Sequence, residues 1–220
     1  MNRIAGIDEA GRGPAIGPMV IAGVLMREEN IKKLLDIGVK DSKKLSSKKR
    51  ERLVMPIKEL AEAHHVEVIE ACDIDWVRKS RNINLLEAEV MAKIINCLIP
   101  EVVQVGSVDI NCERFRRRIV SGLGNDVKVI SVHHAEDIYP AVAAASIIAK
   151  TTRDRLVGML RERYGDFGSG YPNDKKTRQF IADQYAINPE MPPIIRRSWK
   201  TVFKITGIEM KSNLQKTLTG

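Results

Sequence analysis

The sequence lacks the features of several specialised protein classes. No apolar run reaches the roughly 18 residues that a membrane-spanning helix needs, and the first residues show no signal-peptide pattern. Its 3 cysteines match no metal-binding spacing. Because 44% of the residues are hydrophobic and 29% charged, we expect a cytoplasmic globular protein with no membrane association, whose thiols are buried or incidental.

Positive charge is present in excess and is unevenly spread. The net charge is +8 over 220 residues. Basic clusters suit a bound polyanion, although many basic proteins bind no nucleic acid and use their charge for solubility. The three clusters are Lys40, Lys43, Lys44, Lys48, Lys49, Arg50 and Arg52, then Arg114, Arg116, Arg117 and Arg118, and finally Arg196, Arg197 and Lys200.

The order of apolar patterns predicts an α/β fold with a mixed central sheet flanked by helices and a small helical C-terminal part. We expect strands at 3–8, 18–26, 66–69, 102–108 and 127–132, with the first two antiparallel because their link is short. Helices are expected at 28–37, 47–64, 84–98, 113–121, from Pro140 onward, 174–186 and 192–205. Pro56 predicts a kink or break in the helix at 47–64. Asn84 and Glu87 predict a capping arrangement at the start of the helix at 84–98. Residues 1–165 are predicted to form the main domain and 166–220 an extension packed on it.

Two adjacent carboxylates end the first predicted strand. Asp8 and Glu9 precede Gly11-Arg12-Gly13. Hard cations prefer oxygen ligands, glycine lets backbone N–H groups approach a ligand, and arginine suits phosphate. Neighbours in a regular strand point to opposite faces, so the pair can share a metal only if the strand ends or twists there. An acidic turn in solvent is the alternative.

Three further segments carry candidate groups. In Lys40–Leu45, Ser42 and the lysines can hold phosphates, or the segment is a solvated basic loop. In Gly168–Pro172, Tyr171 can stack on a base or sugar, or it is a packed aromatic. At 132–140, Glu136 and Asp137 follow two histidines; the carboxylates can serve a metal site or favour the N-terminus of the next helix, and a zinc site has little support.

Five motifs together resemble type 2 ribonuclease H (ribonuclease HII), particularly its archaeal members. The resemblance runs from Gly6 to about Thr201. It implies a ribonuclease H-like fold, with residues 1–165 as the catalytic domain, and endonucleolytic cleavage of RNA in RNA–DNA hybrids. It also implies incision at ribonucleotides embedded in duplex DNA, two-metal chemistry with Mg²⁺ or Mn²⁺, and 3′-hydroxyl and 5′-phosphate ends. The motifs are GIDEAGRG at 6–13, KDSKKL at 40–45, YPAVAAASIIAK at 139–150, GSGYP at 168–172 and RSWKT at 197–201.

The resemblance assigns roles by position. Gly11, Arg12 and Gly13 would read the ribose 2′-hydroxyl, with Arg12 also gripping phosphate. Tyr171 would stack at the ribose–deoxyribose junction. The residues expected to hold phosphates are Ser42, Lys43 and Lys44.

The implied set of four acidic metal ligands is incomplete. Asp8 and Glu9 match the first two positions, and Glu136 replaces an aspartate at the fourth. Gly106 stands where the third aspartate is expected. Asp109 is the candidate substitute, although three steps along a strand would turn it to the other face and displace it by roughly 10 Å.

Two other functions remain open. A hybrid-binding protein with weak or no turnover would follow from Gly106, and a nuclease or transposase-type enzyme of the same fold would cut DNA alone. The tail Gln215–Gly220 is similar to the start of a sliding-clamp (PCNA) binding box but lacks its aromatics, so a disordered terminus is the alternative to clamp binding.

Overall fold

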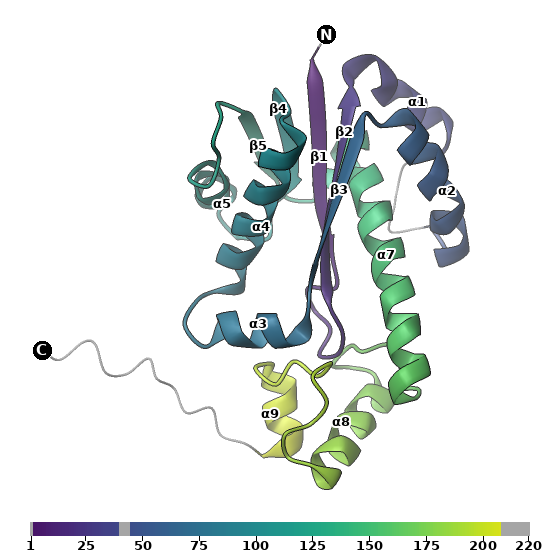
Figure 1. The fold of residues 1–220 in the computed structure, drawn as a ribbon, viewed down its shortest axis with the longest axis vertical. Coiled ribbons are helices and arrows are strands. Elements are labelled where there is room, and N and C mark those ends of the chain that lie inside the picture. The colour runs from purple at the N-terminus through teal and green to yellow at the C-terminus, as the bar shows by residue number, and fades with distance from the viewer. Residues whose placement is uncertain (1, 40–44, 208–220) are drawn as a thin grey trace, which may run out of the picture.

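A five-stranded mixed sheet forms the centre of the protein (Figure 1). The computed structural model describes residues 2–39 and 45–207. The strand order is β3-β2-β1-β4-β5; β1, β2 and β3 are antiparallel neighbours, and β4 and β5 run parallel to β1. The predicted α/β class and the antiparallel first pair are confirmed. The strands are β1 (Arg3–Ala10), β2 (Met19–Arg27), β3 (Ala63–Ile69), β4 (Val102–Gly106) and β5 (Lys128–Val132).

Helices cover both faces of this sheet. One face packs on the long helix and on the helices after β2, and the other packs on the helices between β3 and β5. Side chains of β1 alternate accordingly: Ile7 faces the second layer and Ala10 faces the long helix. The first layer holds α1 (Ile31–Asp36), α2 (Ser47–Leu60) and α7 (Pro140–Tyr164), and the second holds α3 (Ala71–Arg78), α4 (Ile83–Leu98) and α5 (Cys112–Val120).

Helix α7 lies unusually close to β1. A β-carbon at Gly6 would lie 2.1 Å from the carbonyl carbon of Ala141, so residue 6 has room for hydrogen alone. The run of alanines at 143–145 is buried against the sheet. This close packing sets the distance between the α7 side chains and the end of β1.

The C-terminal part shares a core with the loop that follows β1. Ile16 and Val157 pack with Phe167, Ile181 and Val202 in one buried cluster. Two helices, α8 (Lys175–Ile187) and α9 (Lys200–Thr206), lie beyond the carboxyl end of β1 (Figure 1). The domain boundary at 165 stays a prediction.

Several predicted boundaries are wrong for identifiable reasons. Helix α2 ends at Leu60 because the chain from Ala63 pairs with β2, and it continues through Pro56 without a break. Residues 192–199 are not helical, because Ile195 forms a β-bridge with Ile16 and the Arg196 N–H donates to the Ala15 carbonyl. Helix α3 was not predicted. The remaining short helices are η1 (Glu28–Asn30) and α6 (Ala135–Ile138).

Two negative expectations from composition can be compared with the structure. Across residues 2–39 and 45–207, no helix is long and apolar enough to cross a membrane. The thiols are free, as expected, but Cys72 and Cys97 are exposed and Cys112 is half-buried, so the buried alternative is wrong.

Candidate active site

The two carboxylates at the end of β1 face opposite layers of the protein. Asp8 lies opposite Ala22 in the β1–β2 register and faces α7, whereas Glu9 lies opposite Ile21 and faces α4. Asp8 is 7% exposed. The backbone alternation expected of a regular strand therefore persists through the pair, yet a hydrogen bond between the two side chains lowers the pKa of Glu9, so both carboxylates meet at the end of the strand.

Asp8 lies in a pocket of mixed charge. Burial raises its pKa well above the ordinary range, and the charges of Glu9 and Glu136 raise it further. A hydrogen bond with the Ser146 side chain and the charge of Lys150, both on α7, lower it. Three carboxylates thus lie close enough to repel one another, and a cation bound among them would relieve that repulsion.

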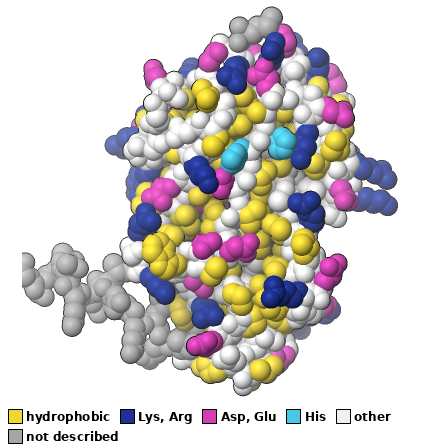
Figure 2. Space-filling model, viewed as in Figure 1, with side chains coloured by type: hydrophobic (Ala, Val, Ile, Leu, Met, Phe, Trp, Pro, Cys, Tyr) yellow, Lys and Arg dark blue, Asp and Glu magenta, His cyan; other side chains and the backbone are white. Residues whose placement is uncertain are grey.

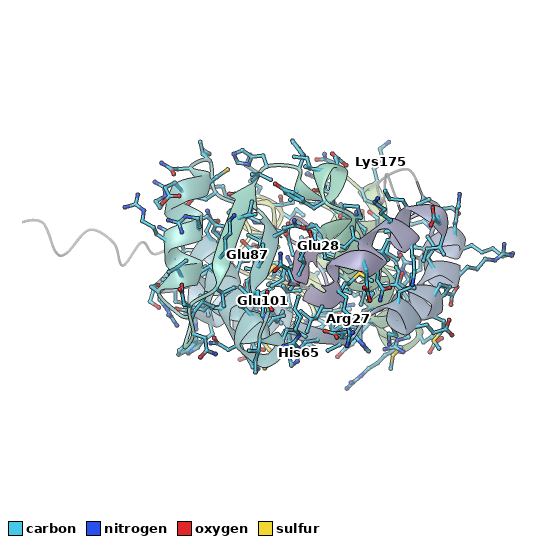
Figure 3. The ribbon with its side chains drawn as sticks, turned by 90° about the horizontal axis from the view of Figure 1, so that it is seen from above. Arg27, Glu28, His65, Glu87, Glu101 and Lys175 are labelled. Atoms are coloured by element: carbon cyan, nitrogen blue, oxygen red, sulfur yellow. The ribbon has the colours of Figure 1, made fainter. Side chains whose placement is uncertain are left out.

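Glu9 belongs to a second carboxylate pair, formed with Glu87 of α4. Burial, followed by the charge of Glu87, raises the pKa of Glu9 to about 7. Burial likewise raises the pKa of Glu87 to about 7, while Arg12 and Arg196 lower it. Glu87 is completely buried, in contrast to Lys175, which is exposed and lies at the edge of the molecule in Figure 3.

Arg12 joins the glycine loop to α4. Its Nε donates to both carboxylate oxygens of Glu87, at 3.0 and 3.1 Å, and its Nη2 donates to Asn84 Oδ1 at 2.6 Å. The helix is capped instead by Asn82, whose side chain accepts from the Asn84 N–H. The prediction that Glu87 serves as a cap is therefore wrong; its carboxylate holds Arg12.

The carbonyls of the same loop are held by the C-terminal part. Arg196 is fully buried and donates to the carbonyl oxygens of Gly11 (2.7 Å), Arg12 (3.0 Å) and Gly17 (2.9 Å). Trp199 Nε1 donates to the Gly13 carbonyl at 3.1 Å. With its carbonyls engaged from one side, the loop is fixed before any ligand arrives.

Helix α7 supplies a further contact to the loop. A β-carbon at Gly11 would lie 2.2 Å from Arg153 Nε, and Gly11 has a left-handed φ of 83°. Arg153 is 7% exposed and donates to the Pro18 carbonyl at 3.3 Å. Glycine at position 11 is thus required both by conformation and by space.

Tyr171 meets the loop at Gly13. A β-carbon at Gly13 would lie 3.6 Å from Tyr171 Cε1, which is ordinary contact distance. The ring is 48% exposed, and the Arg153 guanidinium lies 6.0 Å from its centroid. The tertiary structure therefore brings the predicted ribose-reading loop and the predicted stacking residue together, with the tyrosine accessible.

Gly106 lies beside Asp8. A β-carbon at residue 106 would lie 3.2 Å from Asp8 Oδ1, and this is its one contact within 4 Å among the described residues outside its chain neighbours. A side chain added there would point at the carboxylates. That a metal ligand is missing at this position stays a prediction.

Asp109 has other partners. It is 2% exposed and accepts from Arg114 Nε at 2.9 Å and Arg118 Nη1 at 3.1 Å, with a second bond from Arg114. The backbone N–H of Asn111 donates to it at 3.1 Å. These bonds, that of Arg114 first, hold its pKa well below the ordinary range. Its role as a metal ligand stays a prediction, and its oxygens are engaged by arginines.

Around Glu136, donor atoms gather at the junction between β5 and α7. Ligand atoms of His134, Glu136 and Asp137 lie within 4.8 Å of one another. His134 has a left-handed φ of 54°, and a single turn of helix, α6, follows it. Glu136 is the member of this group whose charge acts on Asp8.

The structure describes only some of the residues predicted to contact phosphates. Ser42, Lys43 and Lys44 lie outside the described residues. The predicted basic clusters are partly consumed by ion pairs, since Arg114 and Arg118 bind Asp109, and Arg116 and Arg117 bind Glu113. On the face shown in Figure 2, Lys and Arg side chains are dispersed among acidic ones.

Three site residues were missed by sequence reasoning. Glu87 was assigned to a cap, and Arg196 was counted only as surface charge. Arg153 drew no attention within α7. The signal for Arg153 is its place among the apolar residues of a buried helix, and the signal for Arg196 is its place directly after two isoleucines. Both patterns predict a buried charge, and a buried charge needs fixed partners.

Comparison with known proteins gives consistent matches. The family profile described as Ribonuclease HII matches residues 5–202. Ribonuclease HII of Thermococcus kodakarensis is 45% identical over 205 residues, which is 92% of this chain and 89% of that protein. The crystal structure of ribonuclease H2 from Pyrococcus horikoshii has a TM-score of 0.87 and 42% identity, covering 93% of this chain and 97% of that one. The structure of the PCNA:RNase HII complex from Archaeoglobus fulgidus contains a chain with a TM-score of 0.82 and 40% identity, covering 90% and 95%.

Replacing the buried carboxylate, Glu87→Gln, should change how stability depends on pH. The pKa of Glu87 is raised by folding to about 7, so between about pH 5 and pH 7 the folded chain binds more protons at this group than the unfolded chain. The unfolding free energy of the wild type, relative to that of the variant, should therefore fall as pH rises through this interval, by on the order of 2 kcal/mol. Urea unfolding in EDTA measures it.

Glu162→Gln serves as the control, because Glu162 is exposed on α7. Its difference from wild type should stay flat over the same interval. A flat difference for Glu87→Gln as well would show that Glu87 does not titrate there.

Proposed function

The chain belongs to the ribonuclease HII family and is a ribonuclease H enzyme, and on that premise we propose that it cleaves RNA in RNA–DNA hybrids and incises duplex DNA at embedded ribonucleotides. The products would carry 3′-hydroxyl and 5′-phosphate ends. One observation carries the proposal: paired carboxylates at the end of β1 lie directly before a fixed glycine loop that an accessible tyrosine contacts.

The family depends on divalent metal ions, and the residues at the end of β1 fit such ions. Asp8, Glu9 and Glu136 offer the oxygen donors that hard cations prefer, and their charges interact unfavourably without a cation. We propose these three as the protein ligands, with Mg²⁺ or Mn²⁺ as the ion. Two ions held there would activate water and stabilise the leaving 3′-oxygen of an in-line displacement.

The chain's own residues then position the substrate. The loop Gly11–Gly13 presents backbone groups to the ribose 2′-hydroxyl, which distinguishes RNA from DNA. Tyr171 stacks beside that ribose, because its ring borders Gly13. Lys150 balances the carboxylate charge near Asp8, and Ser42, Lys43 and Lys44 would contribute phosphate contacts.

Asp109 is better suited to a structural role. A carboxylate that accepts several charged and backbone hydrogen bonds has little left to offer a cation. By holding Arg114 and Arg118 it fixes the start of α5 after β4. Loss of this residue would then disturb the neighbourhood of Gly106 indirectly.

The nuclease proposal is tested by nicking of duplex DNA that contains one ribonucleotide, in Mg²⁺ or Mn²⁺. The wild type should nick at the ribonucleotide and leave an end that a polymerase extends. Asp8→Ala should lose at least about a hundredfold in rate, because a metal ligand is removed. Asp126→Ala, in an exposed turn before β5, is the control and should keep the wild-type rate. Full activity of Asp8→Ala would refute the ligand assignment.

A second candidate function is favoured by Gly106: a hybrid-binding protein with weak or no turnover. One oxygen donor fewer beside Asp8 would weaken metal binding. The two candidates share the binding surface and differ only in catalysis.

Restoring a carboxylate by Gly106→Asp separates them. The β-carbon of the new side chain would lie 3.2 Å from Asp8 Oδ1, a tight distance that a small shift of the neighbour can relieve. We expect the metal concentration for half-maximal nicking to fall by about tenfold. Gly106→Asn adds the same bulk without charge and should give no such gain. If the wild type has almost no activity and Gly106→Asp gains activity, the hybrid-binding candidate is supported. If the wild type is active and Gly106→Asp gains nothing, the third carboxylate is dispensable.

We also propose a sliding clamp as a partner, because the Archaeoglobus fulgidus relative was solved in complex with PCNA. The segment concerned, Gln215–Gly220, lies outside the described residues. Clamp binding by the full chain should be lost when residues 213–220 are removed, and surface plasmon resonance measures this. Equal binding by both chains would place the contact elsewhere.

A further inference from the structure

A pocket of about 300 Å³ lies beside the glycine loop. This volume is at the small end of ligand sites. Segments far apart in the sequence meet there: the loop after β1, the end of α3, and the starts of α4 and α9. The residues that matter for its chemistry are Arg12, Gly13, Arg78, Ile83, Trp199 and Lys200.

Positive charge dominates this pocket. Arg12, Arg78 and Lys200 line it, and Arg196 lies behind Trp199, with its guanidinium carbon 4.9 Å from the ring centroid. Three carboxylates oppose them. Glu87 is bonded to Arg12, the charge of Arg12 also acts on Glu9, and Asp75 accepts from the backbone N–H groups of Arg197 and Ser198. Four cations against three carboxylates leave an excess of positive charge next to the loop.

The Arg78 guanidinium is incompletely satisfied. Among the described residues its Nε is buried and has no hydrogen-bond partner, and its Nη2 makes one long bond of 3.4 Å to the Ser198 carbonyl. Burial lowers its pKa, the charge of Asp75 raises it, and the charge of Arg12 lowers it. Two guanidiniums that repel each other across a pocket are a site where an anion would be bound favourably.

The aromatic wall excludes one class of ligand. The Arg78 guanidinium lies 4.7 Å from the centroid of the Trp199 ring, which the Arg196 guanidinium also contacts. The Nε1 of Trp199 donates to the Gly13 carbonyl. A ring already contacted by two guanidiniums has little surface left for stacking. The pocket therefore suits a small anionic group better than a nucleobase.

We propose that this pocket binds one backbone phosphate of the duplex whose ribose is read at Gly11–Gly13. The inference rests on the proposed function, because Gly13 belongs both to the ribose-reading loop and to the pocket wall. Arg78 and Lys200 hold the phosphate, and Arg12 couples the pocket to the loop. Occupation of the pocket fixes the register of the duplex on the catalytic carboxylates without reading base sequence.

Salt dependence of binding provides the test. The full chain is titrated onto an RNA–DNA hybrid in EDTA, so that no cleavage occurs, and affinity is followed by fluorescence anisotropy at several salt concentrations. Lys200→Gln should weaken binding by about tenfold at low salt and reduce the slope of log affinity against log salt by about 1. Arg78→Gln should act in the same direction.

Matched variants keep the result interpretable. Lys128→Gln removes one exposed charge at the start of β5 and should leave the slope unchanged. Because Arg78 is half-buried, its loss can disturb folding, whereas Lys200 is exposed and decides the question. Wild-type affinity and slope in Lys200→Gln would overturn the proposal.

The phosphate itself is located by neutralising one position at a time with methylphosphonate. At the position whose phosphate occupies the pocket, neutralisation should weaken binding by the wild type but should not further weaken binding by Lys200→Gln. If the methylphosphonate and the Lys200→Gln substitution weaken binding additively at every position, the proposal is overturned. Binding of inorganic phosphate that Lys200→Gln abolishes while duplex affinity stays unchanged would also overturn it, since the pocket would then be a free-anion site. A wild type that binds no hybrid at all would refute the proposed function itself.

Discussion

The close packing of α7 on β1 is the contact on which the rest of the site depends. Helix α7 can lie on the strand because residue 6 has no side chain to separate it from Ala141. At that distance Ser146 and Lys150 reach Asp8, and two turns further on Arg153 reaches Gly11. One helix, placed by one glycine, thus adjusts the charge of a carboxylate and the shape of the loop that follows it.

The loop itself is held by arginines that are largely withdrawn from solvent. Arg196 is fully buried, and burial lowers its pKa to about 9. Carbonyl oxygens of Gly11, Arg12 and Gly17 replace water as its hydrogen-bond acceptors. Such a network is rigid because each donor has a fixed acceptor. A loop that must recognise one hydroxyl group benefits from being ordered beforehand, since less entropy is then lost on binding.

Charge balance is the second theme of the site. The charges of Glu9 and Glu136 raise the pKa of Asp8, and the charge of Glu87 raises the pKa of Glu9. Arg12 compensates Glu87 on the α4 side, and Lys150 is the basic residue whose charge acts on Asp8. Gly106 borders Asp8. Because glycine carries no carboxylate, residue 106 adds no negative charge to those around Asp8.

The sequence alone determined the class of fold, the first pair of strands and the motifs that name the family. These are local properties: alternation along β1, small residues in α7, and the order Asp8, Glu9, Gly11. It also singled out Gly106, which the structure places beside Asp8. Only the tertiary structure showed that Asp109 is bound by arginines, that Glu87 holds Arg12, and that Arg196 braces the loop from 185 positions away. Buried charges choose partners by proximity in space, and no periodicity in the chain encodes that.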